Sequence, residues 1–481
     1  MKAVNSKGQL SASFFAVAVL LLTVVYGLIY RPIVLEQPAL ALEIVFLIAS
    51  AIVVSQALLM GHSWPQLINA ILIKLNRAFP IILLLFAIGI LIGSWMISGT
   101  IPMLIYLGLD MVSVQHIYLT AFVVPIIFSL CTGSSWSTIA TLGLVLITVG
   151  QVVNADLAML TGAIVGGAYF GDKLSPLSDT TNIAAIAVEI EVQQHIKAML
   201  TTTVPAAFLS ACLYFVLGYV YPTTITSDQM ETLVSTKFYL TSLFDFNVWL
   251  LLPPVLILWG SIKRWHSLPT LILSSIVASI LALLFQQVSV TDLFNTLHKG
   301  FNVDMLSSAS SDKMTLVYGL LNRGGIYALI EPIVITILVF IYVGTIDQMR
   351  VIPTIVSSLL HKVNNQKTLI TSTLFASGLT NALTSSQYAN SFIVGEAFSL
   401  KYKEMGVPAP ILSRSIEDTG TMIESLVPWS TTAVFIYASL GVSVGEYWSW
   451  QFLSLINMAI AIIFAQLGVQ YLWKRTKRND S

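Results

Sequence analysis

The stretch Gly171-Asp-Lys-Leu-Ser-Pro-Leu-Ser-Asp-Thr-Thr-Asn182 places two carboxylates, a lysine and a proline between long apolar runs. Pro176 within it removes a backbone donor and disrupts a helix. In a lipid bilayer the backbone groups that a broken helix frees find no water. Such a break therefore persists only where it lines a cavity or packs inside protein. The stretch predicts a helical membrane protein with a helix broken at a polar site.

The composition of the whole chain supports this class. Only 10% of the 481 residues are charged, 56% are hydrophobic, and the mean hydropathy is +0.85. Ordinary soluble domains carry roughly 25% charged residues. The composition therefore predicts a lipid bilayer as the chain's surroundings. The net charge is zero and long basic tracts are lacking, which argues against nucleic acid as a partner.

Several other function classes lack their sequence signals. Cys131 and Cys212 both lie in apolar surroundings, so a disulfide or metal framework is not expected. The chain shows neither a zinc-protease helix motif, nor a nucleophile elbow, nor a phosphate-binding loop. The sequence thus does not indicate an enzyme or an ATP-driven pump.

The apolar runs predict 11 to 13 transmembrane spans in an all-α polytopic fold, the number depending on whether some pieces are re-entrant. Phe14–Tyr30 is interpreted as a retained first helix, and Trp64–Phe79 and Val290–Leu306 as interfacial helices. The candidate spans are 12–30, 39–60, 80–98, 117–149, 157–190, 198–221, 246–261, 268–285, 315–343, 368–400, 411–441 and 448–473.

The spans divide the chain into five expected parts. These are N-terminal spans with an interfacial helix (1–79), a first repeat (80–221), a connecting region (222–313), a second repeat (314–473) and a basic tail (474–481). Basic residues favour the cytoplasmic side. Because the tail holds Lys474, Arg475, Lys477 and Arg478, we expect the C-terminus to be cytoplasmic.

The evidence for two repeats is a second pair of polar breaks. Cys131-Thr-Gly-Ser-Ser-Trp-Ser-Thr138 precedes the first proline-containing stretch. In the second half Thr380-Asn-Ala-Leu-Thr-Ser-Ser-Gln387 precedes Glu424-Ser-Leu-Val-Pro-Trp-Ser-Thr-Thr432. Ser135 lies 41 positions before Pro176, and Ser386 lies 42 before Pro428. Discontinuous helices at corresponding places of two halves indicate a transport site near the bilayer midplane. An odd number of spans in each half would make the repeats inverted.

The residues of these breaks predict a site for Na⁺ and H⁺. A hard cation favours oxygen ligands, and a carboxylate in low dielectric binds a proton more readily. Asp172 is therefore the expected principal site for Na⁺, with Asp179 seven positions later. The supporting residues are Thr132, Ser134, Ser135, Asn182, Asn381, Ser385, Ser386 and Glu424. Alternative roles are an ion pair of Lys173 with Asp172 or Asp179, helix capping by Asp179, and simple helix packing by the Ser and Thr residues.

Other ionisable residues keep alternatives open. Arg323 and Glu331, eight positions apart, form either a buried ion pair or a second site for an anion. Glu417 lies either at the membrane surface or near the second break. Glu396 is expected at an interface. The six histidines mostly border predicted loops, so a histidine proton relay is not expected.

Four stretches resemble the NhaC-type sodium/proton antiporters within the ion transporter superfamily. They are Ser98-Gly-Thr-Ile-Pro102, the segment 171–182, Ser413-Arg-Ser-Ile-Glu-Asp-Thr-Gly420 and Val427-Pro-Trp429. The resemblance covers about residues 80 to 460. It implies a carrier of the bacterial inner membrane with inverted repeats, re-entrant hairpins and no organic cofactor, which exchanges Na⁺ for H⁺. A homodimer is left open.

The resemblance also keeps a second cargo in view. The same family includes exchangers of malate and lactate coupled to Na⁺ and H⁺, for which Arg323 would be the anion partner. The sequence departs from the family pattern at Glu424-Ser425 and at Ser430-Thr431-Thr432. A carboxylate at position 424 serves a cation or a proton more naturally than a dicarboxylate.

Overall fold

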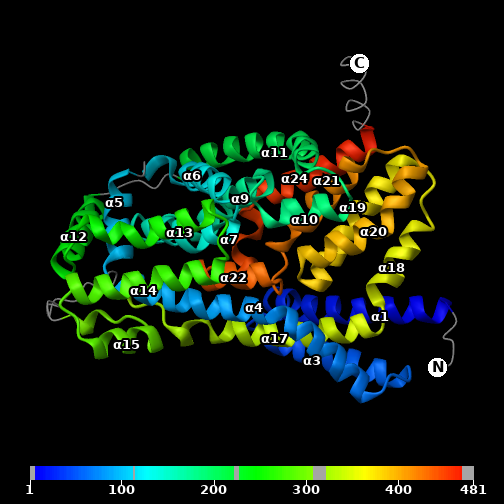
Figure 1. Cartoon of the computed structure of the whole chain (residues 1–481), viewed down its shortest axis with the longest axis horizontal. Coiled ribbons are helices and arrows are strands. Elements are labelled where there is room, and N and C mark those ends of the chain that lie inside the picture. Colours follow the sequence, from blue (N-terminus) through cyan, green and yellow to red (C-terminus); the bar gives the residue numbers. More distant parts are fainter. Residues whose placement is uncertain (1–5, 112–113, 222–226, 307–320, 469–481) are drawn as a thin grey trace, which may run out of the picture.

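The computed structural model describes residues 6–111, 114–221, 227–306 and 321–468, and the regular elements in these ranges are all helices (Figure 1). The helices of the N-terminal part and first half are α1 (Ser6–Val24), α2 (Arg31–Ile33), α3 (Leu42–Leu59), α4 (Trp64–Ile97), α5 (Thr100–Met111), α6 (Ile117–Thr132), α7 (Ser135–Thr138), α8 (Leu144–Val152), α9 (Leu157–Leu174), α10 (Asp179–Ala187) and α11 (Val192–Val220). The π-helical turns η1 (Val25–Tyr30) and η3 (Ile139–Gly143) lie between α1 and α2 and between α7 and α8.

The remaining helices form the connecting region and the second half. They are α12 (Ser227–Leu243), α13 (Leu252–Ile262), α14 (Ser267–Phe285), α15 (Val290–Lys299), α17 (Ile330–Gln348), α18 (Val351–Leu360), α19 (Gln366–Thr384), α20 (Gln387–Glu404), α21 (Ala409–Glu424), α22 (Thr431–Leu440), α23 (Val444–Tyr447) and α24 (Phe452–Leu467). The tail 474–481, on which the predicted orientation rests, lies outside the described residues.

A polytopic helical fold is confirmed, with fewer long spans than predicted. The described ranges hold seven helices long and apolar enough to cross a membrane, or up to nine if each sharply bent pair is one span. The predicted 11 to 13 spans exceed this number because polar breaks divide several apolar runs. The run 117–149 becomes α6, α7, η3 and α8, and the run 411–441 becomes α21 and α22.

The prediction of a separate interfacial helix at Trp64–Phe79 is wrong. Helix α4 continues through this stretch from Trp64 to Ile97 as one helix of 34 residues with Pro80 inside it. Membrane helices tolerate an internal proline because neighbouring groups satisfy the freed carbonyl. The second predicted interfacial helix corresponds to α15, which is a separate helix capped by Ser289 and Asp292.

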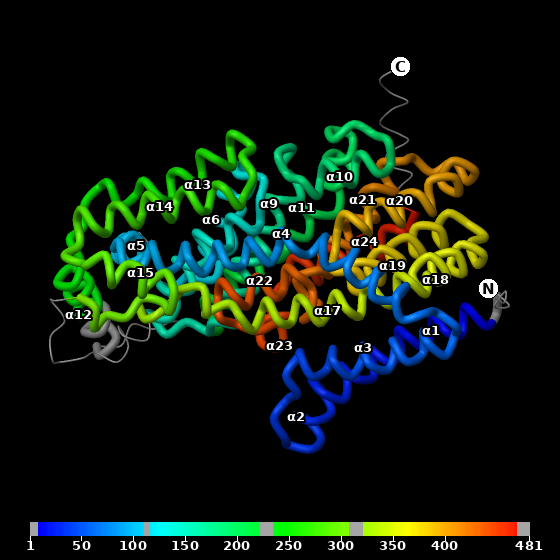
Figure 2. The backbone as a smooth tube through the Cα atoms, turned by 60° about the horizontal axis from the view of Figure 1, so that its bottom comes forward, coloured from blue at the N-terminus to red at the C-terminus, as the bar shows by residue number. Residues whose placement is uncertain are grey.

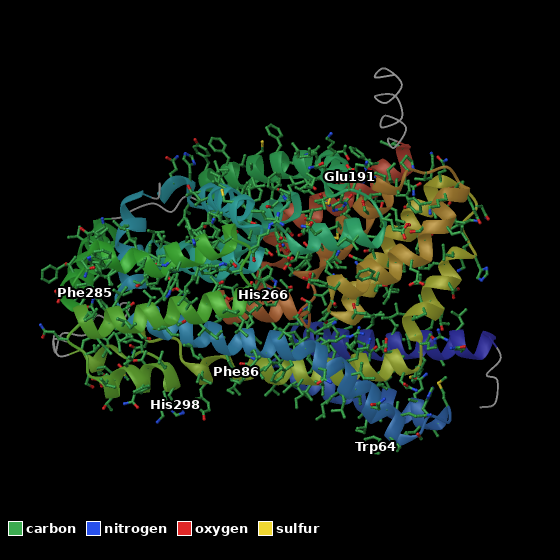
Figure 3. All side chains as sticks on the ribbon, viewed as in Figure 1. Trp64, Phe86, Glu191, His266, Phe285 and His298 are labelled. Atoms are coloured by element: carbon green, nitrogen blue, oxygen red, sulfur yellow. The ribbon has the colours of Figure 1, made fainter. Side chains whose placement is uncertain are left out.

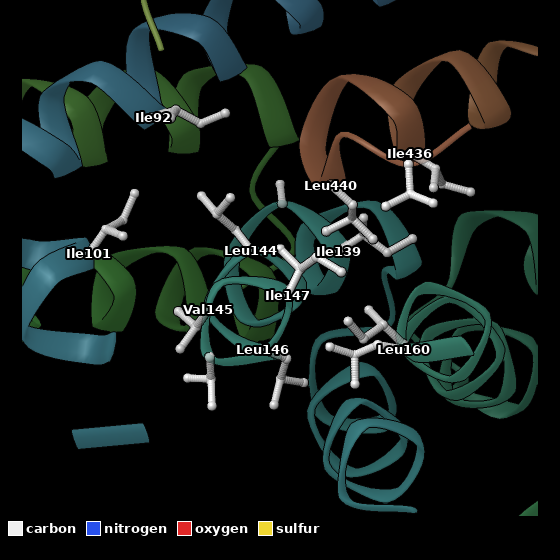
Figure 4. Close-up of a cluster of buried hydrophobic side chains, with 14 of the residues drawn as sticks. Ile92, Ile101, Ile139, Leu144, Val145, Leu146, Ile147, Leu160, Ile436 and Leu440 are labelled. Carbon is white, nitrogen blue, oxygen red and sulfur yellow. The ribbon is translucent and has the colours of Figure 1, made fainter. Parts of the chain in front are cut away.

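Two hydrophobic cores hold the helices together. One contains mainly residues of α4 to α9 with α22, and Figure 4 shows part of it, where Leu144 and Ile147 lie near Leu440. The other core contains mainly residues of α1, of α3 and of the five helices from α17 to α21. Figure 2 shows α2 and α3 projecting from the rest of the molecule beside α17. Helices of both halves contribute to each core, and this arrangement brings the polar breaks of the two halves together.

Candidate functional site

The first break separates α6 from α7. Gly133 ends α6 with a left-handed backbone (φ 67°), and the Ser134 side chain accepts a hydrogen bond from the Ser137 backbone N–H at 3.2 Å. A Cβ at position 133 would lie 2.6 Å from the Leu177 Cβ. Glycine is thus required here both by the backbone conformation and by the close approach of the second break of the same half.

The corresponding break of the second half has the same construction. Helix α19 ends at Thr384, and the residue that follows, Ser385, is also left-handed (φ 51°). The Ser386 side chain then caps α20 by accepting from the Ala389 N–H at 3.3 Å. Serine caps satisfy backbone donors that a helix start leaves free. Both breaks thus consist of a left-handed residue followed by a capping serine.

The two proline-containing breaks match in the same way. Ser178 caps α10 and Ser430 caps α22, each by accepting from the backbone N–H three residues later. Pro176 and Pro428 lie in the turns before these helices rather than inside them. The prolines therefore end the incoming helices α9 and α21, which stop at Leu174 and Glu424.

One constant offset relates the four breaks. Ser134 and Ser386, like Ser178 and Ser430, are 252 positions apart. Ser129 Oγ donates to the Ala168 carbonyl at 2.6 Å, and at the same offset Asn381 Nδ2 donates to the Gly420 carbonyl at 2.7 Å. Ser134, rather than Ser135, is thus the counterpart of Ser386, which makes the spacing to the proline 42 in both halves. This supports duplication, and the inversion of the repeats stays a prediction.

The breaks of both halves line one cavity of about 550 Å³. All the predicted cation-binding residues border it except Asn381: Thr132, Ser134, Ser135, Asp172, Asp179, Asn182, Ser385, Ser386 and Glu424. Segments that are distant in sequence therefore meet at a common polar space. Among the described residues no group of three or more His, Cys, Asp or Glu side chains is arranged to hold a metal ion. A cation in this cavity would rely on neutral oxygens beside its carboxylates.

Asp172 lies at the last turn of α9 and accepts a hydrogen bond from Ser135 Oγ at 2.6 Å. Lys173, its neighbour, does not pair with it. The Lys173 Nζ instead lies 2.7 Å from Asp418 Oδ1 of α21, and both side chains are fully buried. The alternative of a structural ion pair between Lys173 and Asp172 is therefore wrong. Because Lys173 is engaged elsewhere, the Asp172 carboxylate stays free to face the cavity.

Glu424 is the counterpart of Asp172 at the offset of 252. One of its oxygens accepts from Thr432 Oγ1 at 2.8 Å. Three buried oxygens nearby, Ser385 Oγ, Thr421 Oγ1 and Asn381 Oδ1, have no hydrogen-bond partner in the described part of the chain. Buried polar atoms without partners are rare and ask for an explanation, such as a bound ion or water. These oxygens have the chemistry that a hard cation favours.

Asp179 and Asn182 have more peripheral positions. Asp179 is exposed and begins α10, where a carboxylate is favourable to the helix dipole, but the capping side chain is that of Ser178. Asn182 Nδ2 donates to the carbonyls of Pro176 and Ser178 at 3.0 and 2.6 Å. Asn182 thus satisfies carbonyls that the break leaves free.

Arg323 and Glu331 lie outside this site. Arg323 Nη2 donates to Gln151 Oε1 at 2.7 Å, and Glu331 is exposed on α17. The ion pair considered for them does not form between these described residues, and neither residue borders the cavity. The eight-residue spacing was misleading because positive-φ glycines at 324 and 325 turn the chain between the two residues.

Sequence reasoning missed the loop between α13 and α14. Arg264, Trp265, His266 and Ser267 border the cavity, and Figure 3 shows His266 in the middle of the molecule while Phe285, at the other end of α14, lies at its left edge. A tryptophan and a histidine directly after two basic residues were the available signal.

The surface alternative for Glu417 is also wrong, because its side chain is fully buried in α21. His195, expected to border a loop, is fully buried on α11 with its Nδ1 2.8 Å from Ser413 Oγ. Glu396 is exposed on α20, and its position at a membrane interface stays a prediction. The missed feature is thus a buried group of charges beside the cavity.

A helical membrane protein whose two halves break their helices around one polar cavity has the architecture of a secondary transporter. The chain belongs to the Na⁺/H⁺ antiporter family, whose family model matches residues 167–469. This confirms the resemblance that the sequence motifs indicated.

Three relatives illustrate the range of the similarity. An uncharacterized Na⁺/H⁺ antiporter of Haemophilus influenzae is 36% identical over 85% of this chain and 87% of its own. The malate-2H⁺/Na⁺-lactate antiporter of Bacillus subtilis is 32% identical over 87% of each chain. The Na⁺/H⁺ antiporter NhaC of Alkalihalophilus pseudofirmus is 31% identical over 90% of this chain and 91% of its own.

Proposed function

We propose that this protein is a secondary antiporter that exchanges Na⁺ for H⁺ across the bacterial inner membrane by alternating access. The proposal rests on one observation: Asp172 and Glu424 occupy equivalent places in the two halves and border the same cavity. The antiporters among the relatives support the same cargo.

The chemistry follows from the two carboxylates and their neighbours. When both are ionised, they and the oxygens of Ser135, Ser385 and Thr421 can surround a Na⁺ ion with hard ligands. A hydroxyl both donates and accepts hydrogen bonds. The Ser135 hydroxyl can therefore donate its proton to Asp172 while its oxygen lone pairs face the ion. When a carboxylate takes a proton, its charge is lost and the cation is released. Na⁺ and H⁺ then compete for one site, which couples their opposite movements.

Alternating access would use the four broken ends. The half-helices α7, α10, α20 and α22 begin at the cavity, so small movements of the two halves can open it to either side while the ligands stay near the middle. We propose the C-terminus to be cytoplasmic, on the basis of the basic residues between 474 and 481.

A second candidate is exchange of small carboxylates coupled to Na⁺ and H⁺. It is favoured by the malate/lactate antiporter among the relatives and by Arg264, whose side chain borders the cavity. Arg323, the anion partner expected from the sequence, does not border it. The carboxylates of Asp172 and Glu424 would repel an organic anion, so we place Na⁺/H⁺ exchange first.

Transport in proteoliposomes with an internal pH-sensitive dye separates the two candidates. The purified protein is reconstituted, a pH gradient is imposed, and Na⁺ is added without any organic acid. Dissipation of the gradient is the result expected for Na⁺/H⁺ exchange. A gradient that stays intact until malate or lactate is supplied would instead establish the carboxylate exchanger.

A further inference from the structure

Three buried amide side chains lie beside the break between α19 and α20. They are Asn381, on α19, and Gln387 and Asn390, on α20, and at most 3% of each is exposed. Asn381 and Gln387 lie on opposite sides of the left-handed Ser385. Burial of an amide group costs free energy unless its hydrogen bonds are made, so a bonded cluster of buried amides fixes one particular arrangement of the chain.

The three amides share one acceptor. The side-chain oxygen of Gln387, Oε1, accepts from Asn381 Nδ2 at 2.9 Å and from Asn390 Nδ2 at 3.1 Å. Because Asn381 precedes the break and Gln387 follows it, their hydrogen bond bridges the break. Ser377 of α19 joins the cluster, since its Oγ accepts from Asn390 Nδ2 at 2.9 Å. We call these three amides and Ser377 the amide network.

The amide network is attached to α21, the helix that ends at Glu424. Asn381 Nδ2 donates to the Gly420 carbonyl at 2.7 Å, and Ser377 Oγ donates to the Ile416 carbonyl at 2.6 Å. A Cβ at position 420 would lie 2.5 Å from Ser377 Oγ, so the glycine allows the network to approach the helix. The break is thus fastened to the helix that carries the second carboxylate of the cavity.

The corresponding positions of the first half carry no amides. At the offset of 252, Gln387 and Asn390 correspond to Ser135 and Thr138. Ser135 Oγ donates to the Asp172 carboxylate at 2.6 Å rather than to a network behind it. The shared construction of the breaks therefore does not require amides at these positions, and the amides are a feature of the second half.

An oxygen of the proposed Na⁺ site lies between the two bridged residues. Ser385 Oγ is buried, borders the cavity and has no hydrogen-bond partner among the described residues. Asn381 lies one helical turn before Ser385, and Gln387 lies two positions after it. The Ser385 carbonyl also accepts from Thr431 Oγ1 of α22 at 3.2 Å. The backbone that carries this hydroxyl is therefore held by both α21 and α22.

The rigidity of a ligand bears on which cation a site accepts. Selectivity between hard cations depends on the size of the cavity and on the number and flexibility of its oxygen ligands. A flexible oxygen can retreat from a larger ion, whereas an oxygen fixed by supporting hydrogen bonds keeps one distance to the ion. A network that holds Ser385 in place thus disfavours ions larger than the one that fits.

We propose that the amide network positions Ser385 and thereby makes the site select Na⁺ against the larger K⁺. This proposal rests on the proposed Na⁺/H⁺ exchange, because Ser385 is a ligand only in that account. Asn390 is the most informative member of the network. It does not border the cavity, so its substitution acts on the cation only through its neighbours, as expected of a positioning residue.

The test uses Asn390→Ala, in which Gln387 keeps the bond from Asn381 and Ser377 keeps its bond to α21. We measure the Na⁺ and K⁺ concentrations that half-maximally raise the unfolding temperature of the purified protein, at an ionic strength held constant with choline chloride. The ratio of the K⁺ to the Na⁺ concentration should fall at least about threefold. The maximal rate of Na⁺-dependent proton flux in proteoliposomes should stay within about twofold of the wild-type rate.

Gln286→Ala is the matched control. Gln286 is also a buried amide, its Nε2 donates to the carbonyls of Ser98 and Asp245 at 3.1 and 3.2 Å, and it does not border the cavity. Its substitution should lower the unfolding temperature without ions, as Asn390→Ala does, but leave the ratio of the two concentrations unchanged. An equal fall of the ratio in both variants would trace the effect to lost stability and overturn the proposal.

An unchanged ratio in Asn390→Ala also overturns the proposal. If that variant does not fold, Asn390→Thr, which introduces the residue type of the equivalent position 138, is judged by the same ratio. A hydroxyl has one proton and cannot make both donor bonds of the amide. A wild-type protein that Na⁺ stabilises but that shows no Na⁺-dependent proton flux would refute the proposed function alone, and the ratio would still decide the positioning role.

Discussion

Asp172 and Glu424, 252 residues apart, lie in the last turns of two equivalent helices and border the same cavity from opposite halves of the chain. Asp172 accepts a hydrogen bond from Ser135 of its own half, and Glu424 accepts one from Thr432 of its own half. Each half thus supplies one carboxylate and one hydroxyl donor. The site is therefore a product of both halves, and changes in either half should affect the binding of the ion.

Replacing Glu424 by glutamine should weaken Na⁺ binding without preventing folding. The glutamine keeps the size of the side chain but removes one of two negative charges beside the cation. We expect the Na⁺ concentration for half-maximal exchange to rise about tenfold or more, which corresponds to about 1.4 kcal/mol. Dye-based exchange assays over a range of Na⁺ concentrations measure this. An unchanged Na⁺ dependence would exclude Glu424 from the site.

Ser385 offers a test of the oxygens without partners. Ser385→Ala should raise the half-maximal Na⁺ concentration several-fold, because it removes a candidate ligand, while stability changes little. Ser439→Ala is the matched control, since Ser439 Oγ is also buried without a partner among the described residues but does not border the cavity. Equal effects of the two substitutions on Na⁺ dependence would argue against a ligand role for Ser385.

Substitutions at the left-handed residues Gly133 and Ser385 should have different effects on the stability of the protein. Gly133→Ala forces a Cβ to within 2.6 Å of Leu177 and should destabilise the protein by more than about 1 kcal/mol. Ser385→Gly relieves a positive φ of 51° and should be neutral or stabilising by up to about 1 kcal/mol. Thermal unfolding in detergent compares the two variants. A loss of stability in Ser385→Gly as large as that in Gly133→Ala would contradict this account of the breaks.

The buried pair of Lys173 and Asp418 predicts strong destabilisation when one partner is removed. Asp418→Asn leaves the Lys173 ammonium group buried without its counter-charge, at a cost of about 3–5 kcal/mol. The double variant Lys173→Met with Asp418→Asn removes both charges and should recover part of this loss. Unfolding temperatures of the purified variants measure both effects. A single variant as stable as the wild type would show that the pair contributes little.

Much of the site was predictable because its signals are local. The polar stretches around Pro176 and Pro428 lie in apolar surroundings, and their common spacing indicated that they belong together. Capping serines and a left-handed glycine follow from the same short-range chemistry. Nearly all the candidate ligands that these features indicated border one cavity.

The features that could not be predicted from the sequence depend on contacts between segments that are distant in it. Lys173 and Asp418 are 245 positions apart, and Lys173 had a nearer carboxylate on each side of it in the sequence. Arg264 lies in a short polar loop, and no local pattern in the sequence indicates that this loop borders the cavity. The continuity of α4 through Pro80 depends on neighbouring helices, which no local pattern describes.

The most direct test of the central claim is the binding and exchange of Na⁺ by Asp172→Asn. Radioactive Na⁺ binding to the purified variant and Na⁺-dependent proton flux in proteoliposomes are measured beside the wild type, with membrane insertion and monodispersity checked first. We predict that Asp172→Asn inserts normally, binds Na⁺ at least about tenfold more weakly and shows no Na⁺-dependent proton flux. Proton flux at the wild-type rate with unchanged Na⁺ affinity would contradict the assignment of the ion to Asp172 and move the site elsewhere.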